Sequence, residues 1–356
     1  MKRRRFSWVL PIVFCVASIG TMLVGQRAEA LQIAEEEGEY ELSLTVFGQG
    51  EFTMRDAGGS APLQYGFSVS KARLKSQATW NDVGSLKIQI GGAGGNVVLK
   101  DMVATLSIAD PVHFRIGRFK TPISAEYNIS SADLIMVDRA LLRGLIPGRR
   151  IGGDVRLMLG DDEQGGVAFT GELGLFNPVN RGIATAQGQL LTARALLELG
   201  FGLDIHASYG QVVFDDNTTT SNPAQPGRPE PFNQTADVAL QYNQGRVNAH
   251  AEALAVFDAA GTDETPLAFY SHFGYRIGAE DAINVEPMVG YDYVSDEPAI
   301  TQVGGMATRI YRETHRMTVG ANLYWLDSHL VSTLNYRLET RGDVGHAAFL
   351  QLQASI

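Results

Sequence analysis

The chain has 356 residues, of which 45% are hydrophobic and 19% are charged, and its formal net charge is −10. An acidic chain repels the phosphates of nucleic acids, so this composition argues against a protein that binds DNA or RNA. The single cysteine, Cys15, leaves no partner for an internal disulfide, which argues against a disulfide-stapled secreted domain.

Residues 1–30 have the features of a secretory signal peptide that is cleaved from the mature chain. A basic start at residues 2–5 is followed by an apolar stretch from Trp8 to Val24 and by the small-residue site Ala28–Ala30. An amino-terminal membrane anchor is the alternative, but Pro11 interrupts an apolar core that is already short for a membrane span. Cleavage would remove five basic residues and one acidic residue, which leaves 24 basic and 38 acidic residues and a net charge of −14.

After an expected short acidic tail at residues 31–39, a single domain at residues 40–356 contains sixteen stretches in which apolar and polar residues mostly alternate. A period of two sends successive side chains to opposite faces of a sheet. The alternation is clean at residues 40–54 and weaker at residues 66–79 and 98–109. The predicted strands are residues 40–54, 66–79, 85–90, 98–109, 113–120, 151–159, 167–176, 190–199, 203–213, 235–243, 247–257, 267–277, 282–293, 308–326, 329–338 and 347–356.

No run of about 18 apolar residues follows the leader, so no transmembrane helix is expected. Only helices and closed barrels satisfy all of their backbone hydrogen bonds in lipid. One apolar face and one polar face per strand therefore predict an all-β fold, a 16-stranded antiparallel transmembrane β-barrel with a water-filled lumen.

The connections between the predicted strands alternate between short turns and links that are mostly longer, which is typical of outer-membrane barrels with long extracellular loops. Residues 121–150 form the longest link, and long links without regular structure are commonly functional. Aromatic residues near strand ends suit the two membrane interfaces, although ordinary strand propensity is an alternative explanation. The longer links are residues 55–65, 91–97, 121–150, 177–189, 214–234, 258–266, 294–307 and 339–346.

Several motifs in residues 66–180 occur in a recognisable order. Gly117–Pro122 reads Gly-Arg-Phe-Lys-Thr-Pro, Met136–Arg139 reads Met-Val-Asp-Arg, and Arg149–Gly152 reads Arg-Arg-Ile-Gly; Ala72–Leu74 precedes them and Leu173–Asn177 follows. This order resembles the phosphate- and polyphosphate-selective porin family, porins O and P. In that family a Gly-Gln-Phe-Lys-x-Pro-like strand end leads into the third loop, a Phe-Ile-Glu-Arg-like segment follows, and Arg-Asp-Ile-Gly opens the next strand.

The resemblance implies a homotrimer in the outer membrane, in contact with lipid and lipopolysaccharide, with an inward-folded third loop that narrows each pore. Arginine suits phosphate because its planar guanidinium offers paired, charge-assisted hydrogen bonds. The predicted constriction and anion-binding residues are Lys120, Arg139, Arg143, Arg149 and Arg150, and the possible pore-wall residues are Lys71, Arg73, Lys75 and Arg118. The alternative is that the loop arginines pair with Asp133, Asp138, Asp154 or Glu172 and only pin the loop.

The sequence thus predicts an outer-membrane porin through which small hydrophilic solutes diffuse passively, with anions such as phosphate as the expected solutes and with no enzymatic step or cofactor. The mature chain is acidic, and its sequence does not indicate an extended ladder of arginines along the lumen. Lumen acids such as Glu41, Glu172 and Glu252 leave open a general or weakly cation-selective porin. A barrel enzyme or an adhesion barrel with a plugged lumen is the alternative of another class.

Overall fold

The structure is a computed structural model that describes residues 31–34, 40–56, 62–81, 83–93, 96–160, 166–177, 189–213, 234–257, 265–278, 283–303, 306–325, 329–341 and 343–355. The predicted signal peptide, residues 1–30, lies outside these described residues. No helix in the described part of the chain is both long and apolar enough to cross a membrane.

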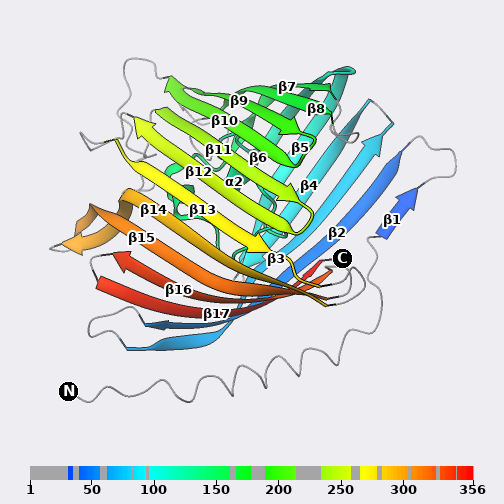
Figure 1. Ribbon diagram of the computed structural model, residues 1–356. Helices are drawn as coiled ribbons and strands as arrows, with labels where there is room; N and C mark the ends of the chain where they lie inside the picture. Colours follow the sequence, from blue (N-terminus) through cyan, green and yellow to red (C-terminus); the bar gives the residue numbers. More distant parts are fainter. Residues whose placement is uncertain are drawn as a thin grey trace, which may run out of the picture.

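Sixteen antiparallel strands form one closed barrel, which confirms the predicted fold class (Figure 1). Each strand pairs with the next along the chain, and β17 pairs with β2 to close the sheet. The strands are β2 Glu41–Asp56, β3 Gln64–Trp80, β4 Gly84–Ala93, β5 Asn96–Ala109, β6 Val112–Lys120, β7 Arg149–Gly160, β8 Val167–Phe176, β9 Gln189–Leu199, β10 Leu203–Val213, β11 Gln234–Gln244, β12 Val247–Phe257, β13 Leu267–Tyr275, β14 Asn284–Val303, β15 Met306–Trp325, β16 Leu330–Arg341 and β17 Asp343–Ser355.

A short additional strand, β1 Leu31–Ala34, lies at the point of closure beside β2 (Figure 1). It pairs with residues 41–44 of β2, whereas β17 pairs with the same strand from Phe47 onward. The backbone groups of β2 that β17 does not reach therefore find partners in β1. The sequence analysis placed these four residues in the acidic tail, and the structure pairs them with the barrel.

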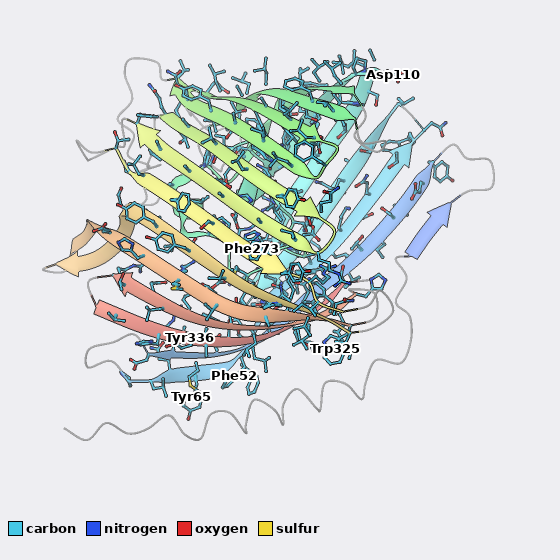
Figure 2. All side chains as sticks on the ribbon, viewed as in Figure 1. Phe52, Tyr65, Asp110, Phe273, Trp325 and Tyr336 are labelled. Atoms are coloured by element: carbon cyan, nitrogen blue, oxygen red, sulfur yellow. The ribbon has the colours of Figure 1, made fainter. Side chains whose placement is uncertain are left out.

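The two faces of the barrel have the polarity that the alternation predicts. Gln49 and Asn322 are buried inside, whereas Val46, Leu173 and Met317 are exposed on the outer surface. Aromatic side chains project from the outside, with Phe52, Tyr65 and Tyr336 toward one end of the strands and Trp325 toward the other (Figure 2). An apolar outer face and a polar inner face are what a barrel in lipid needs.

Two register shifts explain why β3 and β5 alternate less cleanly in sequence. The pairing of β2 with β3 shifts between Gln49 and Gly50, which leaves Ser70 as an extra residue in β3. The pairing of β4 with β5 shifts between Gln89 and Ile90, which leaves Lys100 as an extra residue in β5. A bulge of one residue reverses the faces of all residues beyond it, so the apolar column of each strand changes from odd to even numbers.

The connections differ in part from the predicted links. Residues 121–148 remain the longest connection of the barrel. Residues 297–303 of β14 pair with residues 306–312 of β15, so most of the link predicted at residues 294–307 is a continuation of two strands. The link predicted at residues 339–346 is likewise shortened, because β16 and β17 remain paired up to Arg341 and Asp343. The sequence analysis ended these strands too early because their outer ends are polar.

The connection at residues 121–148, called the third loop below, folds into the barrel (Figure 1). It contains the short helix α2 Ala125–Asn128 and the 3-10 helix η1 Leu141–Leu145. Its apolar side chains pack on the inner wall at β12, β13 and β14, where Leu254, Val256 and Tyr270 are buried. The largest buried apolar cluster thus lies between the third loop and β12 to β14, and the open half of the barrel is the side of β3 to β7, which faces the cavities.

Glycines on the inner wall form the seat of the third loop. Ile123 packs against Gly210 of β10, and Ile135 packs against Gly274 of β13. Met136 Cε lies 2.5 Å from where a Cβ of Gly290 in β14 would stand. A side chain at any of these glycines would occupy the space that the loop uses, so the wall is hollowed to accept the loop.

Candidate functional site

Two cavities run along the open half of the barrel, one on each side of the third loop. The lower cavity, on the side of the short turns, has a volume of about 620 Å³, and the upper cavity, toward the third-loop end, has a volume of about 470 Å³. Of the described residues, three line both cavities: Arg73, Lys120 and Arg149. These three basic side chains therefore mark the passage between the two cavities, and they are called the constriction below.

Each constriction residue is held by a different partner. Lys120 ends β6 and donates from Nζ to the carbonyl oxygens of Tyr127 at 2.7 Å and Ile129 at 2.8 Å. Arg149 begins β7 and donates from Nε to Asp101 Oδ1 at 2.6 Å. Arg73 lies in the middle of β3 and donates from its guanidinium to Ser131 Oγ at 2.8 Å.

Of these three, Arg73 is the one whose charge is least compensated. Its described hydrogen bond is to a neutral hydroxyl, and no carboxylate of the described residues lies within ion-pair distance of it. Its guanidinium also lies over the ring of Phe47, 5.7 Å from the ring centre, which fixes its orientation. A positioned guanidinium without a carboxylate partner can accept an anion from the passage.

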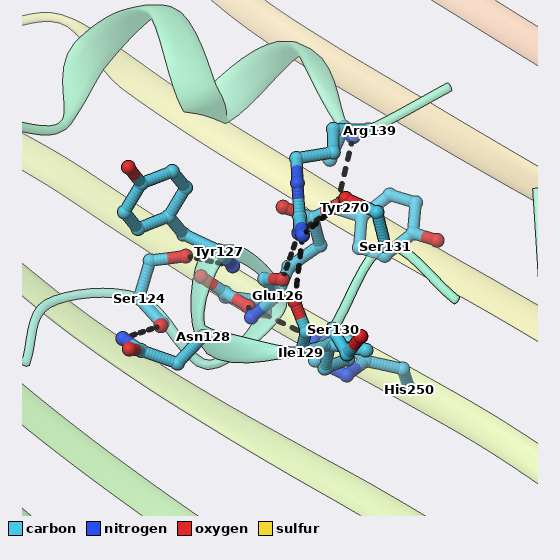
Figure 3. A network of polar contacts seen from close by, with 12 residues as sticks. Ser124, Glu126, Tyr127, Asn128, Ile129, Ser130, Ser131, Arg139, His250 and Tyr270 are labelled. Carbon is cyan, nitrogen blue, oxygen red and sulfur yellow. Dashed lines mark hydrogen bonds and ion pairs between the residues drawn. The ribbon is translucent and has the colours of Figure 1, made fainter. Parts of the chain in front are cut away.

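Among the predicted loop residues, Arg139 is a structural anchor and Arg143 faces open space. Arg139 donates to the carbonyl oxygens of Glu126 and Ile129, both at 2.6 Å, and forms an ion pair with the Glu126 carboxylate at 3.3 Å (Figure 3). Arg143, in η1, is exposed to the upper cavity. Arg150 is buried on the inner face of β7, where its guanidinium donates to the carbonyl oxygen of Arg149 at 3.2 Å, and it lines neither cavity.

The predicted pore-wall residues divide between the two faces of the barrel. Lys71 lines the upper cavity and Lys75 the lower one, and both face inward because of the bulge at Ser70. Arg118 differs from the prediction. It pairs across the sheet with Met102, which is exposed on the outer surface, and it lines neither cavity. Residues directly opposite each other in a sheet share a face, so Arg118 belongs to the outer face.

The structure also contains a basic ladder that the sequence analysis did not expect. It lines the lower cavity and rises from β3 and β4 through β6 and β7 to β9. The net charge of the chain did not reveal this ladder, because net charge is a sum over all residues. Only alternate residues of a strand face the lumen, so the lumen can be basic in an acidic chain. The alternation within residues 112–120 and 189–199 could have revealed it, since the basic residues fall on the polar column. The ladder consists of Lys75, Lys87, Arg115, Arg156 and Arg194.

Two wall carboxylates hold the ladder in place. Glu172 of β8 accepts from Arg115 at 2.9 Å, Arg194 at 3.0 Å and Arg156 at 3.1 Å. Asp154 of β7 is also paired with Arg115. The sequence analysis considered these two acids as partners for the loop arginines, but the structure pairs them with arginines of the wall.

Charge is distributed unevenly over the two cavities. Eight basic and three acidic residues line the lower cavity, whereas seven basic and one acidic residue line the upper one. The low-dielectric wall around a narrow passage focuses such a field and raises the local concentration of anions. Among the described residues, no group of three or more His, Cys, Asp or Glu side chains is placed to hold a metal ion.

The third loop is fixed along its length by side chains of the opposite wall. Asn335 accepts from the backbone nitrogen of Val137 at 3.1 Å, and Gln353 donates to the carbonyl oxygen of Ala132 at 2.7 Å. Asp138 pairs with Arg337 of β16 at 3.0 Å. Burial raises the pKa of the Asp138 carboxyl, but the charge and hydrogen bond of Arg337 outweigh burial and leave this pKa below its usual value.

A search of protein-family models found no match for this chain, and a search of curated proteins found none either. Solved porin structures share its fold. An anion-selective porin from Comamonas acidovorans is 13% identical with a TM-score of 0.62, and the match covers 89% of this chain and 100% of that one. Salmonella typhi OmpF in complex with daunomycin is also 13% identical, with a TM-score of 0.63 and coverage of 92% and 100%. A trimer form of OmpT from Vibrio cholerae is 13% identical with a TM-score of 0.55, covering 88% and 99%.

Proposed function

We propose that this protein is an outer-membrane porin that lets small hydrophilic anions, such as phosphate, diffuse passively through a water-filled pore. The observation that carries the proposal is the constriction, where the three described residues common to both cavities are all basic and two of them are arginines. Passage needs no covalent chemistry and no cofactor, because a solute only has to enter, bind weakly and leave.

The arrangement of charge favours anions along the whole path. An anion that enters from the upper cavity meets Lys71, Arg143 and Lys100 before it reaches Arg73. Beyond the constriction the basic ladder continues into the lower cavity. Closely spaced cationic positions lower the barrier between successive sites, so that binding at one position does not trap the ion.

The predicted location and assembly belong to this proposal. The signal peptide at residues 1–30 would direct the chain out of the cytoplasm, and the apolar outer face would then be in contact with outer-membrane lipid and lipopolysaccharide. A homotrimer is consistent with the trimer form of the Vibrio cholerae structure, which shares the fold.

A general or weakly cation-selective porin is the second candidate. It is favoured by the acids that remain in the lower cavity, Asp101, Glu198 and Asp204. Asp101 is already paired with Arg149, however, and lies 3.9 Å from Lys87, so its charge is compensated. The two cavities that flank the third loop disfavour an adhesion barrel with a plugged lumen.

The test is the reversal potential of the purified protein in planar bilayers under a salt gradient, with chloride and then with phosphate. The native protein should pass a steady ohmic current with anion preference. Arg73→Ala and Arg143→Ala should each shift the reversal potential toward cation preference, with the larger shift for Arg73→Ala because Arg73 lines both cavities and Arg143 only the upper one.

Arg118→Ala is the matched control, since it removes the same charge from the outer face and should leave the reversal potential unchanged. Equal shifts for Arg73→Ala and Arg118→Ala would contradict the assignment of the constriction. A native protein that prefers cations would contradict the proposed anion pore, and a closed barrel with hydrolytic activity would support the enzyme alternative.

A further inference from the structure

Behind the third loop, three carboxyl groups are buried together at a distance from the water of the pore. Glu126 of α2, Asp237 of β11 and Glu252 of β12 have exposed fractions of 1%, 3% and 1%. Buried carboxylates are costly unless a cation or hydrogen-bond donor satisfies each of them. The contacts of this cluster therefore indicate how many negative charges it can hold.

One of the three has its own cation. Glu126 is paired with Arg139 within the third loop (Figure 3). The cationic group that acts on Asp237 is Arg194 of β9, and Arg194 is already paired with Glu172 at 3.0 Å and bonded to His206 Nδ1 at 3.3 Å. Asp237 and Glu252 thus have no uncommitted arginine or lysine among the described residues, and the basic side chain in contact with Glu252 is His250.

Asp237 and Glu252 also each have a carboxylate oxygen without a hydrogen-bond donor. Ala239 lies opposite Glu252 in the pairing of β11 with β12, so Asp237 is a diagonal neighbour of Glu252 on the inner face. Asp237 Oδ2 and Glu252 Oε1 are buried and have no hydrogen-bond partner among the described residues. Two adjacent acceptors without a donor are satisfied together by a single proton between them, as in other buried carboxyl pairs.

The same pair holds the start of the third loop. Glu252 Oε2 accepts from the backbone nitrogen of Glu126 at 2.7 Å and from His250 Nε2 at 2.8 Å. Asp237 Oδ1 accepts from Ser208 Oγ at 3.1 Å, and Ser208 Oγ in turn accepts from the backbone nitrogen of Ser124 at 3.2 Å. Two backbone donors at the start of α2, the nitrogens of Ser124 and Glu126, are therefore tied to this carboxyl pair, through Ser208 and directly.

We propose that Asp237 and Glu252 share one proton and that this shared proton positions the third loop in the pore. Loss of the proton places two like charges side by side in a buried site, which weakens both attachments of α2. The wall lies behind α2, so the released segment can move only toward the passage. Lys120 in the constriction holds the carbonyl oxygens of residues 127–129, so such a movement changes the constriction directly.

The other charged and titratable groups around the pair come from each neighbouring element. His206 lies on β10 and His250 on β12, and Tyr270 and His272 lie on β13. Tyr270 is bonded to His272 Nδ1 at 2.7 Å and His272 Nε2 to Asn248 at 2.9 Å, so these two rings are satisfied by each other and by a neutral amide. Asp292 of β14 accepts from the backbone nitrogen of Leu141 and lies 3.9 Å from Arg316, so it has its own donor and its own cation.

The inference rests on the proposed function, because its main readout is a pore current. Single-channel conductance of the reconstituted full-length protein is measured from about pH 5 to about pH 10, which spans the range in which buried carboxyl pairs lose a shared proton. The native protein should show a fall in conductance or rapid closures on the alkaline side. Asp237→Asn should lose this transition, because the amide supplies Glu252 with a permanent donor, and Glu252→Gln should lose it for the same reason.

Asp292→Asn is the matched control, since it changes an equally buried carboxyl that holds the same loop but has its own cation, and it should keep the transition. A native conductance that does not change with pH, or an alkaline transition that persists in Asp237→Asn, would overturn the proposal.

Infrared spectroscopy gives a second readout that does not depend on the current. The native protein should show the carbonyl band of a protonated carboxyl at neutral pH, and this band should disappear as the alkaline transition proceeds and be absent from Asp237→Asn. If the native protein lacks this band, the proposal of a shared proton is wrong. This result needs no variant, so it holds even if the substituted proteins do not fold. An ohmic current without anion preference would contradict the proposed function instead, and the pH dependence of that current would still decide the shared proton.

Discussion

Glu172→Gln tests whether the basic ladder is held together by a single wall carboxylate. Glu172 is nearly fully buried and accepts from three guanidinium groups at 2.9 to 3.1 Å. A hydrogen bond to a charged group contributes about 1.5–3 kcal/mol, so three of them give at least about 4.5 kcal/mol before compensation.

Two features of the structure reduce this value. Arg115 keeps its pairing with Asp154 after the substitution, and the three arginine side chains are 13% to 28% exposed, so lumen water solvates them in part. A glutamine can also still accept one hydrogen bond. We therefore expect the free energy of unfolding to fall by about 3 kcal/mol, near the lower limit for breaking a buried ion pair.

The assay is equilibrium denaturant unfolding of the refolded protein in lipid vesicles, with Glu198→Gln as the matched control. Glu198 lines the lower cavity, as the three arginines bound by Glu172 do, and no ion pair joins Glu198 to another described residue. Glu198→Gln should change the free energy of unfolding by less than about 0.5 kcal/mol. Both variants remove one negative charge, Glu198 from the lining of the lower cavity and Glu172 from the wall beside it, and both should increase anion preference. A Glu172→Gln variant as stable as Glu198→Gln would refute the role assigned to Glu172.

Three further perturbations test the seat and the anchors of the third loop. Gly210→Val should push Ile123 off the inner wall and lower single-channel conductance, at a cost of about 1–3 kcal/mol in stability, whereas Gly48→Val, with open space around it, should leave conductance unchanged. Arg139→Ala leaves the buried Glu126 carboxylate without its cation and should lower the free energy of unfolding by about 3 kcal/mol; a loss below about 1 kcal/mol would contradict its role as an anchor. The pKa of Asp138 is lowered in the folded protein, so its pairing with Arg337 stabilises the loop above the ordinary carboxyl value of about 3.9 and is lost as the pH falls below that value. Asp138→Asn should therefore reduce the loss of stability on acidification, and an unchanged acid profile would count against this linkage.

The sequence by itself was sufficient to predict the barrel fold. Alternation in residues 40–54 and 247–257 predicts which side chains face lipid and which face the lumen, because only a period of two separates them onto two faces. The length of residues 121–150 likewise identifies the longest connection, whereas its inward fold was implied only by the family resemblance. In residues 247–257 the lumen-facing side chains are polar at first but apolar at Leu254 and Val256. In the structure these two residues pack against the third loop, so this change of polarity marks where the loop binds the wall.

What the sequence left open was the function of each basic residue, and only the tertiary structure decided it. Arg73 and Arg118 are both arginines within the recognised motifs, yet one faces the passage and the other the outer surface. The difference depends on a single extra residue at Ser70 and on the register of neighbouring strands, which are set by pairing across the barrel. Arg139 and Arg143 lie four residues apart in one loop, but one is committed to Glu126 and the other is exposed to the upper cavity. A period of two can be read along one strand, whereas a partner carboxylate can come from any strand that the closed barrel brings near.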